Sequence, residues 1–302
     1  MYTGPITPEL LCRSVIAVPP LARDANLEIV ESENATLIRH IEAGGVSSLL
    51  YGGNANLFHC RVSEYQGLLE ILERSSGKDT WVIPSVGPAW GMAMDQASLI
   101  AETDFPSAML LPMQGAVTSD GVIEGAKRLA GALGKPAILY IRQENYVYPD
   151  ALGRLVDEGT VACVKYAVAR GDPSQDEYLS RLVGAIDPKL VVSGIGEQPA
   201  IAHMREFGLA GFTAGLVCLT PERTQRMLRR IQDGDFESAE AIRSSYEELE
   251  GLRNAINPIR ALHEMVTLSG IADMGPQLPL LSGLSEADSI ALRNAIDRFS
   301  RG

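Results

Sequence analysis

Short apolar segments alternate with longer amphipathic segments along the first 220 residues. Each apolar run is hydrophobic at consecutive positions, as expected for strands buried on both faces. The amphipathic stretches between them have the length of helices, so successive strands should run parallel with right-handed crossovers. Eight such units predict a (β/α)8 TIM barrel, with an open doubly wound sheet as the alternative. The predicted strands are 14–18, 46–50, 80–84, 107–111, 136–140, 161–165, 189–193 and 209–213.

The alternation ends near residue 220, and the remaining sequence has a helical pattern. Thr220 precedes Pro221, an arrangement typical of a helix N-terminus, and Ser285 precedes the acidic first turn of a last helix. No Gly/Ser-rich linker separates the two parts. We therefore expect a barrel core at 1–220 and C-terminal helices at 221–302, packed on the barrel as a single structural unit.

Composition excludes several classes of protein. The chain has 302 residues, 46% of them hydrophobic and 21% charged, which is ordinary for a globular protein. Its net charge of −12 argues against a nucleic-acid partner and against an anionic membrane surface. The N-terminus has no secretory pattern, and no run of 18 apolar residues could span a membrane. Four cysteines without a CxxC pair indicate reduced thiols, so we expect a cytoplasmic location.

Cofactor and metal motifs are missing from the sequence. Gly134-Lys135 lacks the rest of a phosphate-binding loop. Gly194-Ile195-Gly196 lacks the third glycine of a dinucleotide fingerprint, because residue 199 is proline. The four histidines, His40, His59, His203 and His263, have no metal-ligand spacing. We expect no cofactor and no metal.

Lys165 is the strongest candidate for covalent chemistry. It alone among five lysines ends an apolar strand-like run, VACVK. Because catalytic groups of a TIM barrel lie at the carboxyl ends of its strands, we expect Lys165 in the barrel mouth, on the strand face of Cys163. A free lysine is only about 0.04% neutral at pH 7, and apolar surroundings favour the neutral amine that forms Schiff bases. A structural ion pair across the barrel is the alternative role.

Two further groups are expected at the same mouth. Tyr140 ends the fifth predicted strand, beside that of Lys165, where its phenol could transfer protons to and from a carbinolamine. A strand-end aromatic with its hydroxyl in solvent is the alternative. The second predicted strand is followed by Gly52-Gly53-Asn54-Ala55-Asn56. Glycines allow close backbone approach to a ligand, and their N–H groups can hold a carboxylate.

These three positions together resemble the dihydrodipicolinate synthase / N-acetylneuraminate lyase family of class I aldolases. The resemblance covers nearly the whole chain, including the barrel and a helical tail with Asn257-Pro258-Ile259 and Leu278-Pro279-Leu280. It implies that Lys165 forms the Schiff base, that Tyr140 transfers protons and that the loop Gly52–Asn56 binds the carboxylate of a 2-oxo acid. It also implies a homo-tetramer.

The loops are most similar to the 5-dehydro-4-deoxyglucarate dehydratase branch of that family. Residues 52–65 align without gaps with the branch's GGTGEFFSL, and the sequence YIRQEN from Tyr140 to Asn145 resembles its YNRDN. Synthases carry an arginine at the position of Asn145, and the tyrosine of their hydroxyl relay appears here as Met113. After Lys165 the pair Gly171-Asp172 comes two residues later than usual.

These departures shape the expected substrate. Arg142 could hold the distal carboxylate of a sugar acid, while Asn54 and Asn56 bind its hydroxyls, because an amide both donates and accepts hydrogen bonds. We therefore expect a Schiff-base lyase or aldolase acting on pyruvate or a 2-oxo-3-deoxy sugar acid, by cleavage, condensation or dehydration. A true 4-hydroxy-tetrahydrodipicolinate synthase and a non-catalytic 2-oxo-acid-binding barrel are the alternatives, and an unrelated metal-dependent barrel enzyme lacks ligands.

Overall fold

All eight predicted strands are present in the computed structural model, which describes residues 1–301. They pair in sequence order and close into a barrel, which confirms the TIM-barrel prediction and excludes the open sheet. Several strands begin later than expected. The seventh starts at Val191 rather than 189, because Pro188–Leu190 forms a 3-10 turn. The strands are β1 (Ile16–Ala17), β2 (Ser48–Tyr51), β3 (Trp81–Val86), β4 (Ala108–Leu110), β5 (Ala137–Ile141), β6 (Val161–Tyr166), β7 (Val191–Ser193) and β8 (Gly211–Ala214).

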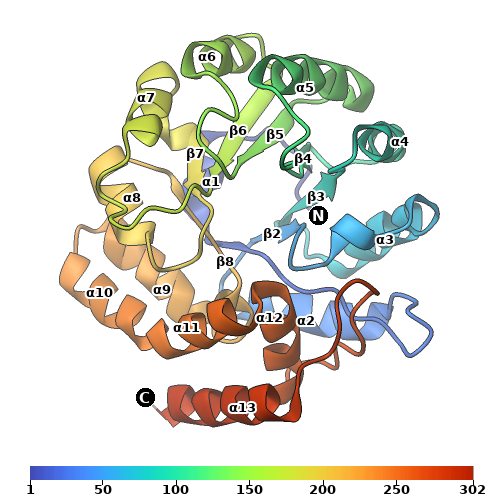
Figure 1. Ribbon diagram of the computed structural model, residues 1–302, viewed down its shortest axis with the longest axis vertical. Helices are drawn as coiled ribbons and strands as arrows, with labels where there is room; N and C mark the ends of the chain where they lie inside the picture. The colour runs from blue at the N-terminus through green and yellow to red at the C-terminus, as the bar shows by residue number, and fades with distance from the viewer. Residues whose placement is uncertain (302) are drawn as a thin grey trace. The chain divides into compact units, whose positions relative to one another are not determined.

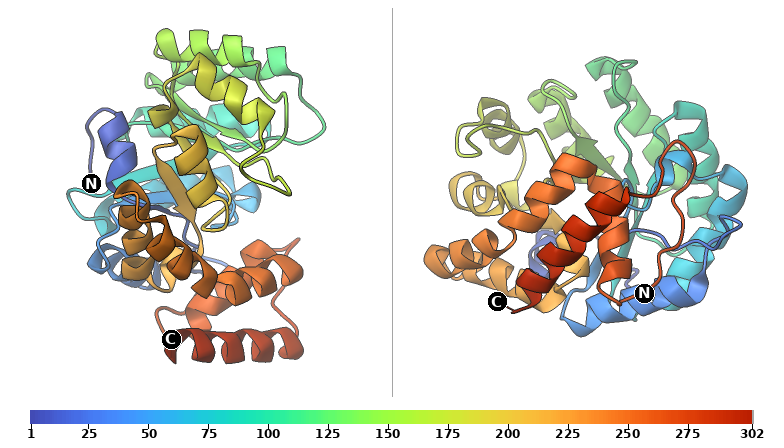
Figure 2. Two further views of the ribbon diagram at one scale, coloured as in Figure 1. Left: turned by 90° about the vertical axis from the view of Figure 1, so that its left-hand side faces the viewer. Right: turned by 60° about the horizontal axis from the view of Figure 1, so that its bottom comes forward.

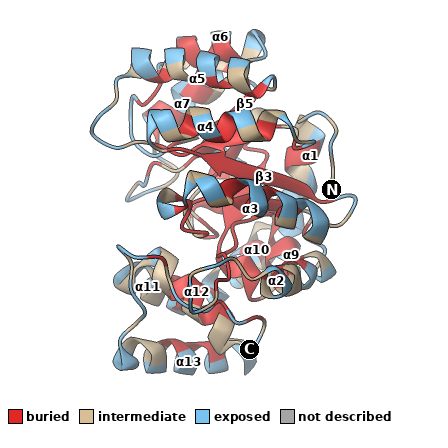
Figure 3. Ribbon diagram, turned by 90° about the vertical axis from the view of Figure 1, so that its right-hand side faces the viewer, coloured by how far each residue is buried: buried red, intermediate tan, exposed pale blue. Residues whose placement is uncertain are grey.

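Contacts within the chain group residues 2–15 and 83–213 into one compact unit. In this unit β4, β5, β6 and β7 form a continuous parallel ladder. The helices from α4 (Trp90–Ala101) to α8 (Ala200–Phe207) follow one another around these strands, each in contact with the next (Figure 1). Figure 3 shows the amphipathic pattern behind this packing, with buried and exposed positions alternating along α4 and α5. The helices of the unit are α1 (Pro8–Arg13), α4 (Trp90–Ala101), α5 (Ser119–Leu133), α6 (Pro149–Asp157), α7 (Glu177–Ala185) and α8 (Ala200–Phe207).

The other unit combines residues 16–82 with 214–301. Its C-terminal helices contact one another, and α13 lies along α11 and α12 (Figure 2). The helix predicted after Thr220 begins at Pro221, but the Thr220 hydroxyl pairs with the Tyr246 hydroxyl at 2.8 Å instead of capping the helix. The proposed division at residue 220 remains a prediction. The helices are α2 (Glu31–Ala43), α3 (Val62–Ser75), α9 (Pro221–Gln232), α10 (Phe236–Ser245), α11 (Glu247–Ile256), α12 (Pro258–Leu268) and α13 (Glu286–Arg301).

The segment between α12 and α13 returns to the start of the chain. The N–H of Arg23 donates to the carbonyl of Met274 at 3.0 Å. Gly275 has a φ of +64°, and a β-carbon there would lie 1.9 Å from the Arg23 carbonyl oxygen. Only glycine fits this crossing, because both the left-handed backbone and the close approach exclude a side chain.

None of the helices within residues 1–301 is long and apolar enough to cross a membrane.

Candidate active site

Lys165 and Tyr140 lie side by side on neighbouring strands. They are direct partners in the register of β5 and β6. The Nζ of Lys165 is 4.2 Å from the centroid of the Tyr140 ring, and the lysine is only 5% exposed. Burial disfavours an ammonium ion, whereas the ring face attracts one, so this amine lies between two opposing influences. The structure thus brings together the two residues that the sequence paired as nucleophile and proton carrier.

The two faces of β6 have different surroundings. Cys163 is two residues before Lys165 and is buried, which raises the pKa of its thiol to about 12. On the opposite face, Tyr166 lies 6.1 Å from the rings of Tyr178 and His203, and its hydroxyl donates to Asp176 at 2.7 Å. Burial and this acceptor raise the pKa of Tyr166. Tyr166 therefore supports the helices, and Tyr140 is the phenol beside Lys165.

Gly194 and Glu197, in the segment after β7, were not predicted from the sequence as site residues. The N–H of Gly194 donates to the carbonyl of Tyr166 at 2.6 Å, and a β-carbon on Gly194 would lie 2.9 Å from the Cγ of Lys165. Gly194 therefore leaves room for the lysine stem. Glu197, three residues later, is fully buried. A glycine and an acid directly after a predicted strand are the sequence signal for such residues, because the strand ends of a TIM barrel carry its site.

The loop after β5, residues 142–148, carries Arg142 directly beyond the strand end. Arg142 is exposed, and no ion pair within residues 1–301 includes it. Asn145, at the position of the synthase arginine, is exposed and adopts a left-handed φ of +56°. Tyr146 is buried, which raises the pKa of its hydroxyl. Arg142 thus has no ion-pair partner within residues 1–301 and lies two residues after Tyr140 in the chain.

The glycine loop after β2 forms a tight turn. The N–H of Asn56 donates to the carbonyl of Gly53, and that of Leu57 to Gly52. The ring of Phe58 lies 3.3 Å from the position of a β-carbon on Gly53, so this site favours glycine. The expectation that these glycines let the backbone approach a ligand carboxylate remains a prediction.

The two asparagines of this loop differ in their surroundings. The Nδ2 of Asn54 donates to the carbonyl of Val18 at 2.8 Å and lies close to Gly215, as does a guanidinium nitrogen of Arg253. Asn56 has a left-handed φ of +56° and is buried, with neither side-chain polar atom bonded. It lines a cavity of about 10 Å³, the space of roughly one water, with Leu21, Arg23, His263, Pro276, Gln277 and Leu278 among its other walls.

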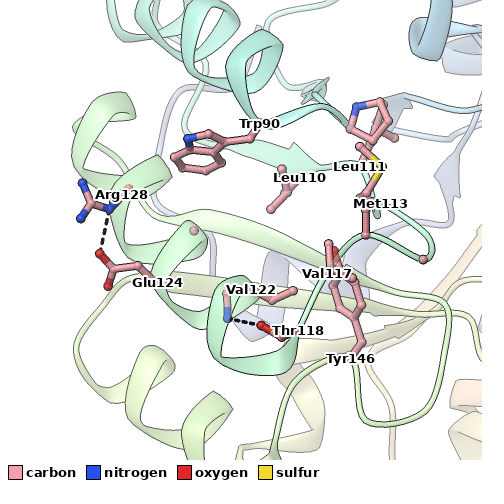
Figure 4. Close-up of a pocket in the computed structure, with 15 residues that line it drawn as sticks. Trp90, Leu110, Leu111, Met113, Val117, Thr118, Val122, Glu124, Arg128 and Tyr146 are labelled. Carbon is pink, nitrogen blue, oxygen red and sulfur yellow. Dashed lines mark hydrogen bonds and ion pairs between the residues drawn. The ribbon is translucent and has the colours of Figure 1, made fainter.

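A larger cavity of about 650 Å³ lies beside α4 and α5 (Figure 4). Its walls are mainly apolar and include Trp90, which is 45% exposed, together with Leu110 and Met113. Lys165 and Tyr140 are not among the residues that line it. The candidate active site is therefore assigned from the Lys165–Tyr140 pair and not from this cavity.

Histidines and acids give no sign of a metal site. Within residues 1–301, no group of three or more His, Cys, Asp or Glu side chains could hold a metal ion. His203 contacts Ser193 at 2.8 Å, and His263 contacts the carbonyl of Gly275 at 2.9 Å, so both have hydrogen-bonding partners inside the fold. His59 is exposed after the glycine loop.

Comparison with known proteins connects this geometry to a family. The chain is 25% identical over 227 residues to a 4-hydroxy-tetrahydrodipicolinate synthase from Hyphomonas neptunium, covering 72% of this chain and 75% of that protein. A sialic acid aldolase from Ruminococcus gnavus has a TM-score of 0.84 at 15% identity, covering 96% and 98% of the two chains.

A prophage protein of the dihydrodipicolinic acid synthase family from E. coli K12, solved in complex with pyruvate, has a TM-score of 0.81 at 15% identity over 95% of this chain and 98% of that one. These structural matches show the same fold. The model of the dihydrodipicolinate synthetase family matches residues 13–297. The chain therefore belongs to the dihydrodipicolinate synthetase family.

Proposed function

We propose that this protein is a Schiff-base-forming lyase that acts on a 2-oxo acid. The observation that carries the proposal is the buried Lys165 amine, 4.2 Å from the ring of Tyr140 across a direct strand pair. Family membership supports the same reading, since the curated relative from Hyphomonas neptunium is named as a synthase of this family.

The pair supplies the groups that the reaction needs. The neutral amine of Lys165 attacks the C2 carbonyl, whose oxygen takes a proton and becomes the carbinolamine hydroxyl. This hydroxyl takes a second proton and leaves as water, forming the C=N bond. Tyr140 is the proposed proton carrier in both transfers, because its phenol can donate and accept. Tyr140, left as a phenolate by the second transfer, then takes a proton from C3 and so forms an enamine. The enamine can add to an aldehyde, whose oxygen takes that proton from Tyr140, or can expel the C4 hydroxyl as water with the same proton.

The other candidate residues support the choice of substrate. We propose that the turn of Gly52, Gly53 and Asn54 holds the 2-oxo carboxylate, as the family resemblance implies. Arg142 would bind a distal carboxylate, since it is exposed and has no counter-ion within residues 1–301. For Asn56, predicted from the sequence to bind substrate hydroxyls, we propose instead that it shapes the turn, because its side chain is buried beside Arg23 and His263. A 2-oxo-3-deoxy sugar diacid fits these groups better than pyruvate alone.

Borohydride trapping tests the proposal. Pyruvate plus borohydride should convert the imine into a stable secondary amine on the single peptide that contains Lys165. Mass spectrometry after digestion locates the adduct, and Lys165→Ala should not be labelled. Labelling elsewhere, or none in the wild-type protein, would overturn the assignment. Trapping without any turnover on a panel of sugar acids would instead indicate a non-catalytic binding barrel.

Assembly and location extend the proposal. We propose a homo-tetramer, as the family resemblance implies, and a cytoplasmic location, which the free cysteines support. Light scattering coupled to size-exclusion chromatography gives the mass that checks the tetramer, and fractionation of the source cells checks the location.

A further inference from the structure

Arg170 connects the loop after β6 to the loop after β5. Its Nε donates to Asp176 at 2.9 Å, and its Nη2 donates to the second oxygen of the same carboxylate at 3.0 Å. Nη2 also donates to Glu144, two residues after Arg142. One guanidinium therefore bridges two carboxylates from different loops.

Asp176 makes a rigid anchor for this bridge. Its side chain is fully buried and also accepts hydrogen bonds from the Tyr166 hydroxyl and the Leu179 N–H, which it caps at the start of α7. Burial by itself would raise the pKa of Asp176, but the donors, Arg170 first among them, outweigh it and hold the pKa below its usual value. Arg170 is thus fixed on one side and reaches Glu144 with the other.

The loop after β5 is held at successive residues. Beyond the Glu144 contact, the hydroxyl of Ser119 donates to the carbonyl of Asn145. The hydroxyl of Tyr178 donates to the carbonyl of Val147 at 2.7 Å and accepts from its N–H at 3.3 Å. Only the Glu144 contact is ionic. The Glu144 contact therefore neutralises a charge in this loop, whereas the other contacts hold its backbone in place.

Charge is the property that Arg170 controls. Glu144 lies two residues from Arg142 and is 51% exposed. Without Arg170 its carboxylate would oppose an anionic ligand at Arg142 and could pair with Arg142 itself. Arg170 lies in the loop after Lys165, in which Gly171-Asp172 comes two residues later than usual in the family. The residue that bridges the two loops therefore belongs to the segment in which this sequence departs from the family pattern.

We propose that Arg170 is a positioning and specificity-determining residue. By holding and neutralising Glu144, it keeps Arg142 available for the distal carboxylate of a 2-oxo sugar diacid. This inference rests on the proposed Schiff-base function but makes a separate claim. Arg170 acts through Glu144 and does not touch the reacting carbon.

The test compares two six-carbon substrates, 5-dehydro-4-deoxyglucarate with its distal carboxylate and 2-oxo-3-deoxygluconate with a terminal hydroxyl. Arg170→Ala should raise KM for the diacid by about tenfold, the effect of one charge-assisted bond, with little change in kcat. KM for the monoacid and the rate of pyruvate trapping should change less than about twofold. An equal loss for both substrates would overturn the inference.

A double variant separates this role from a structural one. Glu144→Gln alone should change KM for the diacid by less than about twofold, because Arg170 already neutralises this carboxylate and the contact is partly exposed. In the Arg170→Ala background, Glu144→Gln should lower KM again, since it removes the unneutralised carboxylate. A double variant as impaired as Arg170→Ala would contradict the charge mechanism. Glu144→Gln lies at an exposed position, so it keeps the test available if Arg170→Ala does not fold.

Control variants separate the role of Arg170 from the proposed Schiff-base function. Arg74→Ala breaks another paired guanidinium, with Glu31, in which both side chains are about half exposed, and should leave both KM values unchanged. Arg170→Lys keeps the charge and should recover most of the diacid KM. If wild-type protein traps no pyruvate, the proposed function fails; if it traps pyruvate but Arg170 variants do not discriminate the substrates, only this inference fails.

Discussion

The strand pair β5–β6 and the loop after β2 carry candidate site residues in different ways. On the strands, the side chains of Lys165 and Tyr140 are fixed by register and by the alternation of faces. In the loop, Asn54 bonds to the carbonyl of Val18, while Asn56 is buried beside the C-terminal segment. Residues two apart in the loop thus have unrelated surroundings. Regular structure makes side-chain placement readable from sequence, and a loop requires knowledge of what packs on it.

The largest expected effect is at the amine itself. Lys165→Ala should reduce turnover to the background rate, because it removes the amine that is proposed to form the imine. Lys165→Arg should be equally inactive, since a guanidinium stays protonated. Steady-state assays with a 2-oxo-3-deoxy sugar acid measure both, and circular dichroism checks the fold. Substantial turnover in either variant would move the chemistry away from β6.

Tyr140→Phe tests the other half of the strand pair. The ring that contacts Lys165 stays and only the hydroxyl is lost, so stability should hardly change. Turnover should fall by roughly 10²–10⁴-fold, the usual contribution of a proton-transfer group. A loss below tenfold would assign the proton transfers to water or another side chain, because Tyr166 is committed to Asp176.

Gly194→Ala tests how closely the lysine stem is enclosed. The new methyl group would lie 2.9 Å from the Cγ of Lys165 and 2.8 Å from the carbonyl of Tyr166, so the amine must shift. Misplacing a reacting group by about 1 Å can lower kcat by about 10²-fold. Gly184→Ala in α7 is the control, because nothing lies within 4 Å of its β-carbon position. It should keep full activity and gain about 0.5–1 kcal/mol of stability.

The sequence could predict the repeated strands of the barrel, but it could not predict contacts between side chains of different loops. Eight apolar runs were sufficient for the barrel, and counting to strand ends placed Lys165 beside Tyr140. Gly194 was missed because its role depends on the neighbouring strand. The bridge from Arg170 to Glu144 joins residues 26 apart through two irregular segments, for which no periodicity exists. Loop chemistry of this kind is visible only once the fold is known.

The buried side chain of His203, in α8, should make the stability of the protein decrease at acidic pH. Burial lowers the pKa of His203 from 6.5 to about 4. Between these values the unfolded chain binds more protons than the folded one. The contribution of His203 to the free energy of unfolding should therefore be constant above about pH 7 and fall as the pH drops from 6.5 toward 4, by up to about 1.4 kcal/mol per pH unit.

Urea denaturation of wild-type protein and His203→Gln at pH 7.5 and pH 5 measures this contribution. Glutamine can still bond to Ser193 but does not titrate, so the variant should lose less stability on acidification. His263, whose pKa burial also lowers, stays in both proteins and cancels from the difference. Equal losses would show that His203 does not titrate across this range.

The smallest effect separates the two asparagines directly. Asn54→Ala removes the hydrogen bond to Val18 and should raise KM a few-fold, as expected for loss of one neutral hydrogen bond of about 1 kcal/mol. Asn56→Gly preserves the left-handed backbone and removes an amide with no partner, so kcat/KM should change less than about twofold and stability should not fall. A loss of activity in Asn56→Gly as large as that in Asn54→Ala would show that the Asn56 amide reaches the substrate. The loop would then rearrange when the 2-oxo acid binds, and the contrast with the rigid strand pair would become one of mobility rather than of direction.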